Sequence, residues 1–251
     1  MIERTVDVTT PEGVMPTWIY HPTHEGPHPV VLYLMDAPSI RPALHDMASR
    51  LASAGYYVLL PFLFYRGSEF REFGTSDEDM HARRELMDTV TPTGILGDAD
   101  ALLGIAAEDA AAADGPFGAV GFCMSGGLTL AIAKAWPERM RAAASIHGAW
   151  LVRDAEDSPH HGLDAMRAET YFAWCADDPT APVEDRKAME AALGDAGVTY
   201  TLDWHDDAVH GFAPAGPRYH RDASELHWER VHSLLRRRTR GELRGPAEQL
   251  G

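Results

Sequence analysis

The chain has 251 residues, of which 45% are hydrophobic and 24% charged, a balance typical of a globular protein with ample material for one packed core. Its formal net charge of −16 disfavours binding to nucleic acids or anionic membranes, because those surfaces are negative too. Two cysteines are too few for a disulfide scaffold, and no apolar stretch approaches the ~20 residues of a membrane span.

The first twenty residues alternate weakly between polar and apolar types around a Pro-Glu-Gly turn, which predicts an antiparallel hairpin at a sheet edge. After residue 29, short continuous apolar stretches of the kind found in strands buried on both faces alternate with helical patterns. The strands are predicted at 30–35, 56–60, 117–122, 142–146, 171–175 and 199–204. The helices are predicted at 42–54, 94–113, 125–136, 183–196 and 220–238. This alternation predicts an α/β fold, with a mainly parallel central sheet and helices on both faces.

Two segments interrupt the alternation. Residues 61–92 are rich in aromatic and charged side chains and are long for a connection, so we expect a lid or cap with a short helix of its own. Residues 150–166 are polar and form a second excursion. We expect residues 1–238 to form a single domain and residues 239–251 to form a flexible tail.

The most informative stretch joins the strand at 117–122 to the helix that follows it. It reads Gly-Phe-Cys-Met-Ser-Gly-Gly at 121–127, which has the form of a nucleophile elbow with Cys123 as the nucleophile. Small residues flank such a turn because strand and helix pass closely there. The thiol would stand at the start of a helix, where backbone N–H groups favour a thiolate. The alternative is a tight turn around an inert buried cysteine.

A cysteine nucleophile needs a base and an acid that orients it, and in folds with this elbow both follow later in the chain. Asp178 comes just after the predicted strand at 171–175 and is our choice for the acid, with Asp177 as the alternative. His210 lies between the last predicted strand and the last helix and is our choice for the base, with His205 as its competitor. The three residues stand in the required order, each at the carboxyl end of a predicted strand, where open α/β sheets bind ligands.

With these motifs in view, the sequence resembles the dienelactone hydrolase family over roughly residues 10–238. The carriers are the elbow at 121–127, Asp-Pro-Thr-Ala-Pro at 178–182 and His-Gly-Phe at 210–212. The resemblance implies the α/β-hydrolase fold and a Cys123, His210 and Asp178 triad that needs no metal or cofactor. It also implies an oxyanion hole formed by the backbone N–H groups of Met124 and Ala37.

The resemblance extends, with departures, to residues around the triad. Where the family carries a thiol-modulating glutamate, this chain has Asp36, which is either its counterpart or a capping or loop aspartate. The stretch after His210 lacks the arginine with which family members hold a substrate carboxylate. The candidate substrate-binding residues are Tyr65, Arg66, Arg83, Arg84, His147 and Phe212.

We therefore expect a hydrolase that cleaves a carboxylic ester or lactone through a thioester. The runner-up is a general carboxylesterase or thioesterase, and a rival of another class is a non-catalytic protein that binds a small ligand. The N-terminus has no signal-peptide pattern, so we expect a cytoplasmic protein, monomeric or homodimeric, with a small-molecule partner and neither nucleic acid nor membrane.

Overall fold

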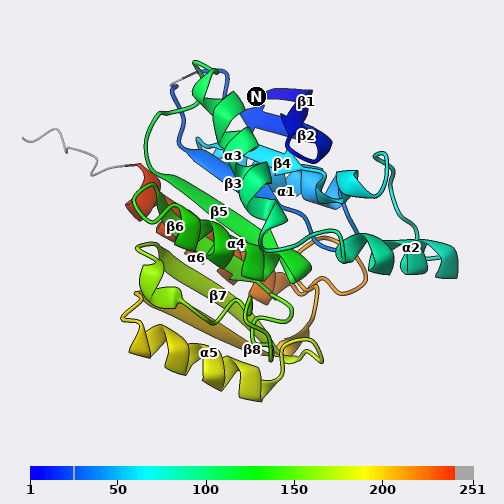
Figure 1. The fold of residues 1–251 in the computed structure, drawn as a ribbon, viewed down its shortest axis with the longest axis vertical. Helices are drawn as coiled ribbons and strands as arrows, with labels where there is room; N and C mark the ends of the chain where they lie inside the picture. Colours follow the sequence, from blue (N-terminus) through cyan, green and yellow to red (C-terminus); the bar gives the residue numbers. More distant parts are fainter. Residues whose placement is uncertain (25, 241–251) are drawn as a thin grey trace, which may run out of the picture.

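The computed structural model describes residues 1–24 and 26–240, and these residues form one eight-stranded sheet with helices around it (Figure 1). The strands are β1 (Ile2–Thr10), β2 (Gly13–His21), β3 (Val30–Leu34), β4 (Tyr57–Pro61), β5 (Phe117–Phe122), β6 (Met140–Ile146), β7 (Glu169–Asp177) and β8 (Tyr200–Val209). Their order across the sheet is β1-β2-β4-β3-β5-β6-β7-β8. The β1–β2 hairpin joins β4 antiparallel, and every other neighbouring pair is parallel. The predicted mainly parallel sheet with an N-terminal hairpin is confirmed.

Helices cover both faces of this sheet, as predicted. The helices are α1 (Pro42–Ser53), α2 (Asp77–Met87), α3 (Gly94–Ala107), α4 (Gly126–Ala135), α5 (Val183–Asp195) and α6 (Arg221–Thr239), with short 3₁₀ turns η1 (Leu63–Arg66), η2 (Cys123–Ser125) and η3 (Leu163–Ala165). In Figure 1, α3 and α4 lie in front of the sheet and α6 lies behind it. Arg50 of α1 pairs with Glu225 of α6 on that rear face, with 2.7 Å between the charged atoms.

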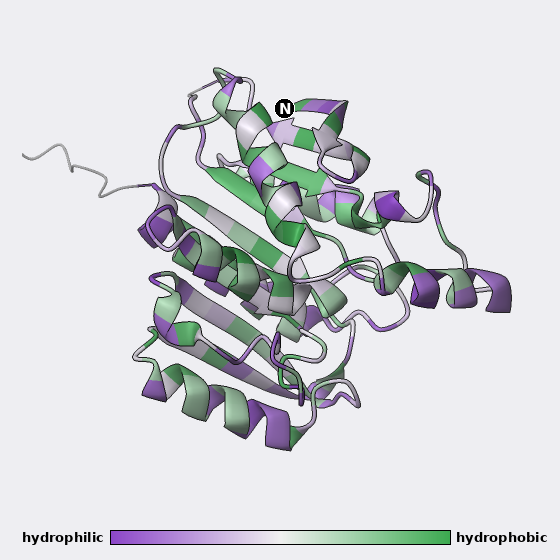
Figure 2. Ribbon diagram, viewed as in Figure 1, coloured by the Kyte–Doolittle hydropathy of each residue, from purple (hydrophilic) through white to green (hydrophobic). Residues whose placement is uncertain are grey.

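Burial explains why the central strands read as continuous apolar stretches. Every residue of β3, β4 and β5 is buried, since helices cover both faces of these strands. The edge strand β1 is mostly exposed, which accounts for its weak alternation. Figure 2 shows the same contrast, with apolar colours along the central strands and hydrophilic colours at α2.

The excursion at 61–92 contains η1 and α2, so the expected short helix is present. Ser76 caps α2 by accepting a hydrogen bond from the Asp79 N–H, and Leu86 is its buried residue. The helix lies on the side of the sheet toward which the central parallel strands point (Figure 1). The predicted helix at 94–113 is shorter than expected and ends at Ala107.

The C-terminal boundary is only partly described. Helix α6 runs to Thr239, the first residue of the predicted tail, and residues 241–251 of that tail lie outside the described part of the chain. The single-domain assignment stays a prediction. In the described residues no helix is both long and apolar enough to cross a membrane.

Candidate active site

Cys123 lies in a sharp turn between β5 and α4. Its backbone has φ 53°, in the left-handed region that side chains other than glycine rarely adopt. Gly121 is required by close packing, because a Cβ there would lie 2.2 Å from the Ser125 carbonyl oxygen. The predicted elbow geometry is therefore present, and it holds the thiol at the carboxyl end of a central strand.

Two further small residues of the motif have specific partners. The hydroxyl of Ser125 donates to the Met35 carbonyl oxygen at 2.5 Å, which ties the elbow to the end of β3. A Cβ on Gly126 would lie 2.4 Å from Oγ of Ser145 on the neighbouring strand β6. Side-chain size at 125 and 126 is thus set by contacts with the adjacent strands.

His210 follows β8 and faces the thiol. Its Nε2 lies 3.0 Å from Sγ of Cys123, and its Nδ1 lies 2.6 Å from Oδ2 of Asp178. Burial lowers the pKa of His210, but the hydrogen bonds with Asp178 and Cys123 outweigh burial and raise it to about 10. The raised pKa favours the protonated ring, and an imidazolium beside sulfur is the arrangement in which cysteine hydrolases attack with a thiolate.

Asp178 is the acid that reaches this histidine. Its side chain is buried, whereas that of Asp177 is exposed. Burial raises the pKa of Asp178, but hydrogen bonds from His210 and Thr180 hold it below the ordinary value. The thiol of Cys175, 3.7 Å away, donates to the same oxygen that His210 contacts. The structure thus brings Asp178, and not Asp177, to His210.

Thr180 was not among the predicted site residues. Its backbone N–H and its hydroxyl both donate to Oδ1 of Asp178, at 2.9 and 2.7 Å. The signal in the sequence was the Asp-x-Thr spacing just after a strand, because a turn aspartate commonly accepts hydrogen bonds two residues on. Thr180 fixes the carboxylate so that its other oxygen faces His210.

The loop after β3 carries Asp36 and Ala37. The Arg41 guanidinium donates to both oxygens of the buried Asp36 carboxylate, at 2.6 and 2.9 Å. In the described residues no hydrogen bond links Asp36 to Cys123, so the observed contacts are those of a loop aspartate. The two candidate oxyanion-hole donors are the N–H groups of Ala37 and Met124. The N–H of Ala37 donates to no backbone group in the described loops and turns. Met124 directly follows Cys123 in the chain.

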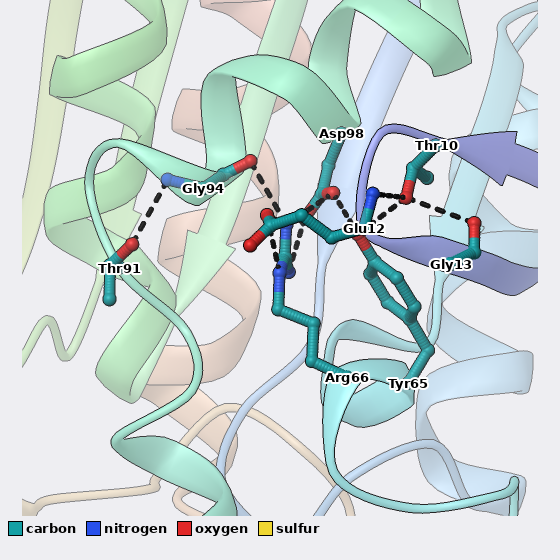
Figure 3. Close-up of polar contacts among 8 residues, drawn as sticks. All are labelled: Thr10, Glu12, Gly13, Tyr65, Arg66, Thr91, Gly94 and Asp98. Atoms are coloured by element: carbon teal, nitrogen blue, oxygen red, sulfur yellow. Dashed lines mark hydrogen bonds and ion pairs between the residues drawn. The ribbon is translucent and has the colours of Figure 1, made fainter.

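Two candidate substrate residues lie in a separate polar cluster, shown in Figure 3. The Arg66 guanidinium donates to both oxygens of Asp98 at 2.8 and 3.0 Å and also reaches Glu12 in the hairpin turn. The Tyr65 hydroxyl lies 2.6 Å from Asp98 and 2.8 Å from the Thr10 hydroxyl. These contacts join η1, α3 and the β1–β2 turn, and neither side chain lines the cavity beside the elbow.

That cavity, of about 660 Å³, lies between α2, the start of α4 and residues 149–159. Met124 lines it, so the cavity reaches the elbow. Of the two arginines predicted on α2, Arg84 lines the cavity, whereas Arg83 does not and donates to the Asp79 carbonyl within its own helix.

The remaining two candidates, His147 and Phe212, are buried near His210. The ring of His147 lies 5.2 Å from the ring of His210, and both ring nitrogens of His147 lack a hydrogen-bond partner in the described residues. Burial holds the pKa of His147 well below its ordinary value, so it is neutral. Phe212 is fully buried and packs edge-to-face on His147 and beside His205. In residues 1–24 and 26–240 no group of three histidine, cysteine or acidic side chains is placed to hold a metal.

Comparison with known proteins gives a consistent result. A family model described as the dienelactone hydrolase family matches residues 15–239. A relative from Synechocystis sp., provisionally named carboxymethylenebutenolidase, is 26% identical, and the match covers 92% of this chain and 98% of the relative. The carboxymethylenebutenolidase of Rhodococcus opacus is 25% identical, with 78% of this chain and 74% of that protein covered.

Solved structures share the fold. A crystal structure of a provisionally named dienelactone hydrolase from Klebsiella pneumoniae superposes with a TM-score of 0.84, at 22% identity, over 94% of this chain and 98% of the other. At that identity the likeness concerns the fold, and it confirms the predicted architecture.

Proposed function

The chain belongs to the dienelactone hydrolase family, and from this we propose that Cys123, His210 and Asp178 act together to cleave a carboxylic ester or lactone. It is a carboxylic ester hydrolase, in line with relatives named carboxymethylenebutenolidase. The observation that carries the proposed triad is the continuous hydrogen-bonded chain from sulfur to imidazole to buried carboxylate.

In the acylation half of the reaction, the Cys123 thiolate attacks the ester carbonyl carbon and forms a tetrahedral oxyanion. The N–H groups of Met124 and Ala37 are the proposed donors to that oxyanion. The oxyanion collapses, the bond to the leaving oxygen breaks, and protonated His210 gives its proton to the departing alkoxide. The products are a thioester on Cys123 and an alcohol, or an opened chain when the substrate is a lactone.

In the deacylation half, His210 is neutral and acts as a base. It takes a proton from water, the hydroxide attacks the thioester carbonyl, and the second tetrahedral oxyanion expels the Cys123 thiolate. The carboxylic acid leaves, and the imidazolium beside the thiolate is restored. Asp178, held by Thr180, keeps Nδ1 protonated and the ring oriented throughout.

We propose only an indirect role for Asp36. Its pairing with Arg41 holds the loop that carries Ala37, so the aspartate would act on the position of an oxyanion-hole N–H. The runner-up activities, a general carboxylesterase or a thioesterase, use the same residues and differ only in substrate.

The decisive experiment compares wild type with Cys123→Ala on p-nitrophenyl acetate and α-naphthyl acetate. We expect kcat/KM to fall by a factor on the order of 10³ or more, because the attacking atom is lost. Circular dichroism and thermal unfolding check that the variant is folded. Activity within tenfold of wild type in a folded Cys123→Ala protein would overturn the proposal. A wild type that binds esters without turning them over would favour the non-catalytic binding protein.

A further inference from the structure

The turn after β6 has a strained backbone. His147 has φ 39° and Trp150 has φ 52°, both in the left-handed region. A bulky side chain at positive φ is uncommon, and such conformations persist only where surrounding contacts hold them. Backbone strain of this kind gathers at functional sites.

Two hydrogen bonds fix the turn to the candidate active site. The N–H of Ala149 donates to the Cys123 carbonyl at 3.0 Å, and the N–H of Trp150 donates to the Thr180 carbonyl at 2.8 Å. The turn is therefore anchored both to the elbow and to the loop that holds Asp178. These two hydrogen bonds hold the backbone that carries the Trp150 side chain in place beside the proposed nucleophile and acid.

The indole held by this strained turn is not part of the core. Trp150 is 43% exposed and lines the cavity beside the elbow, whereas the next residue in the chain, Leu151, is buried in the core. Most of the other apolar lining comes from α2 and the residues after it, the elbow, α4 and the second excursion: Met87, Val90, Pro92, Met124, Leu128 and Pro159. A volume of about 660 Å³ falls in the range of pockets that hold drug-sized ligands.

The charges around the cavity do not favour an anionic ligand. Glu85, Asp88 and Asp157 supply three carboxylates, against the guanidinium groups of Arg84 and Arg153. Arg153 is moreover paired with Asp157, at 3.0 Å. With no excess of positive charge, the cavity offers a substrate carboxylate little attraction, and the net charge of the whole chain adds repulsion.

We propose that this cavity binds a bulky, uncharged apolar group of the substrate against the Trp150 indole. The preferred substrates are then neutral esters or lactones that carry an aryl or medium-chain alkyl group, rather than small or carboxylate-bearing ones. This inference rests on the proposed function, because the cavity is connected to the proposed nucleophile through Met124, which lines it and directly follows Cys123. An apolar pocket changes the ratio of kcat/KM for two substrates by a factor of about 10 to 200 when one of them lacks a well-placed apolar group. We therefore expect Trp150 to set substrate preference by a factor in that range.

Kinetics on paired substrates test the proposal. For wild type, Trp150→Ala and Trp150→Phe, kcat/KM is measured with p-nitrophenyl acetate, butyrate and octanoate and with mono-p-nitrophenyl succinate. The control is Trp204→Ala, which removes a half-buried tryptophan on the edge strand β8, outside the cavity lining. We expect Trp150→Ala to lower the octanoate-to-acetate ratio about tenfold or more, Trp150→Phe to restore much of it, and Trp204→Ala to leave it unchanged.

Wild type should also prefer the butyrate over the succinate half-ester. An unchanged octanoate-to-acetate ratio in Trp150→Ala, or a wild-type preference for the succinate, would overturn the inference while Cys123-dependent turnover continued. Calorimetric binding of 1-naphthol to Cys123→Ala separates the two proposals. Binding that weakens about tenfold when Trp150→Ala is added supports the cavity even if turnover proves independent of Cys123, whereas equal binding in both proteins overturns it.

Discussion

Nδ1 of His210 lies 2.6 Å from Oδ2 of Asp178, a carboxylate with only 1% of its side chain exposed. Thr180 donates two hydrogen bonds to the other carboxylate oxygen, Oδ1, and so holds Oδ2 toward the imidazole. This pairing outweighs the burial that disfavours a charged histidine and, with the Cys123 contact, raises the pKa of His210 to about 10.

The raised pKa of His210 predicts how stability depends on pH. A histidine bound more tightly to its proton in the folded state contributes stability that is fully present below its unfolded pKa, about 6.5. That contribution is lost as the pH rises toward about 10. To keep the Cys123 thiol from titrating alongside His210, both proteins carry Cys123→Ala. The free energy of unfolding of Cys123→Ala, measured by urea denaturation, should therefore fall relative to Cys123→Ala/His210→Gln as the pH rises above 6.5.

His227 provides the matched control for this measurement. It is fully buried, and burial lowers its pKa to about 3, so it is neutral in both the folded and unfolded protein above pH 7. His227→Gln should shift stability by a constant amount from pH 7 to 10. A difference between Cys123→Ala and Cys123→Ala/His210→Gln that does not change over the same range would contradict the imidazolium assignment.

Iodoacetamide should distinguish the two thiols. Cys123 is partly exposed and lies beside an imidazolium, whereas Cys175 is fully buried and burial raises the pKa of its thiol. We expect intact-mass and peptide analysis of the folded protein to show one carbamidomethyl group, on Cys123, in step with loss of esterase activity. In urea both cysteines should react, and labelling of Cys175 in the folded protein would count against the structure described.

The elbow should not tolerate a methyl group at position 121. Gly121→Ala would place Cβ 2.2 Å from a backbone oxygen, and relieving that overlap should cost about 1–3 kcal/mol of stability and distort the Cys123 turn. Gly104→Ala in α3 is the control, because nothing lies within 4 Å of its added Cβ and alanine favours the helix by about 0.5–1 kcal/mol. Equal stability of the two variants in urea denaturation would refute the close packing.

The Arg66–Asp98 pair should matter more to stability than a surface pair. Asp98 is 1% exposed, so Arg66→Met leaves a buried carboxylate without its main partner, at a cost of about 3 kcal/mol. Arg141 pairs at 3.7 Å with Glu138, whose side chain is 80% exposed, and Arg141→Met should change the free energy of unfolding by less than about 1 kcal/mol. Thermal and urea unfolding of the two variants test this, and similar losses would mean that burial does not make the Arg66–Asp98 pair in Figure 3 more important than a surface pair.

Much of the fold could be predicted from local sequence, and so could the order along the chain of the candidate catalytic residues. Strands buried on both faces must be continuously apolar, so β3, β4 and β5 stood out, while the exposed edge strand β1 gave only a weak signal. The elbow at Cys123 was visible because a strand–helix turn of that tightness needs small neighbours. Asp178 and His210 followed from their places after late strands, because the carboxyl ends of parallel strands meet at one edge of a sheet.

The sequence by itself therefore determined the features that depend on backbone conformation and chain order: the buried strands, the elbow at Cys123, and the positions of Asp178 and His210 after late strands. The tertiary structure decided the partners. It placed Tyr65 and Arg66 against Asp98, more than thirty residues away, paired Asp36 with Arg41, and selected the buried Asp178 over the exposed Asp177. It also decided that Trp150 faces the cavity from a strained turn. Neighbouring side chains compete for the same partners, and the outcome depends on burial and on segments distant in the chain, which no local pattern encodes.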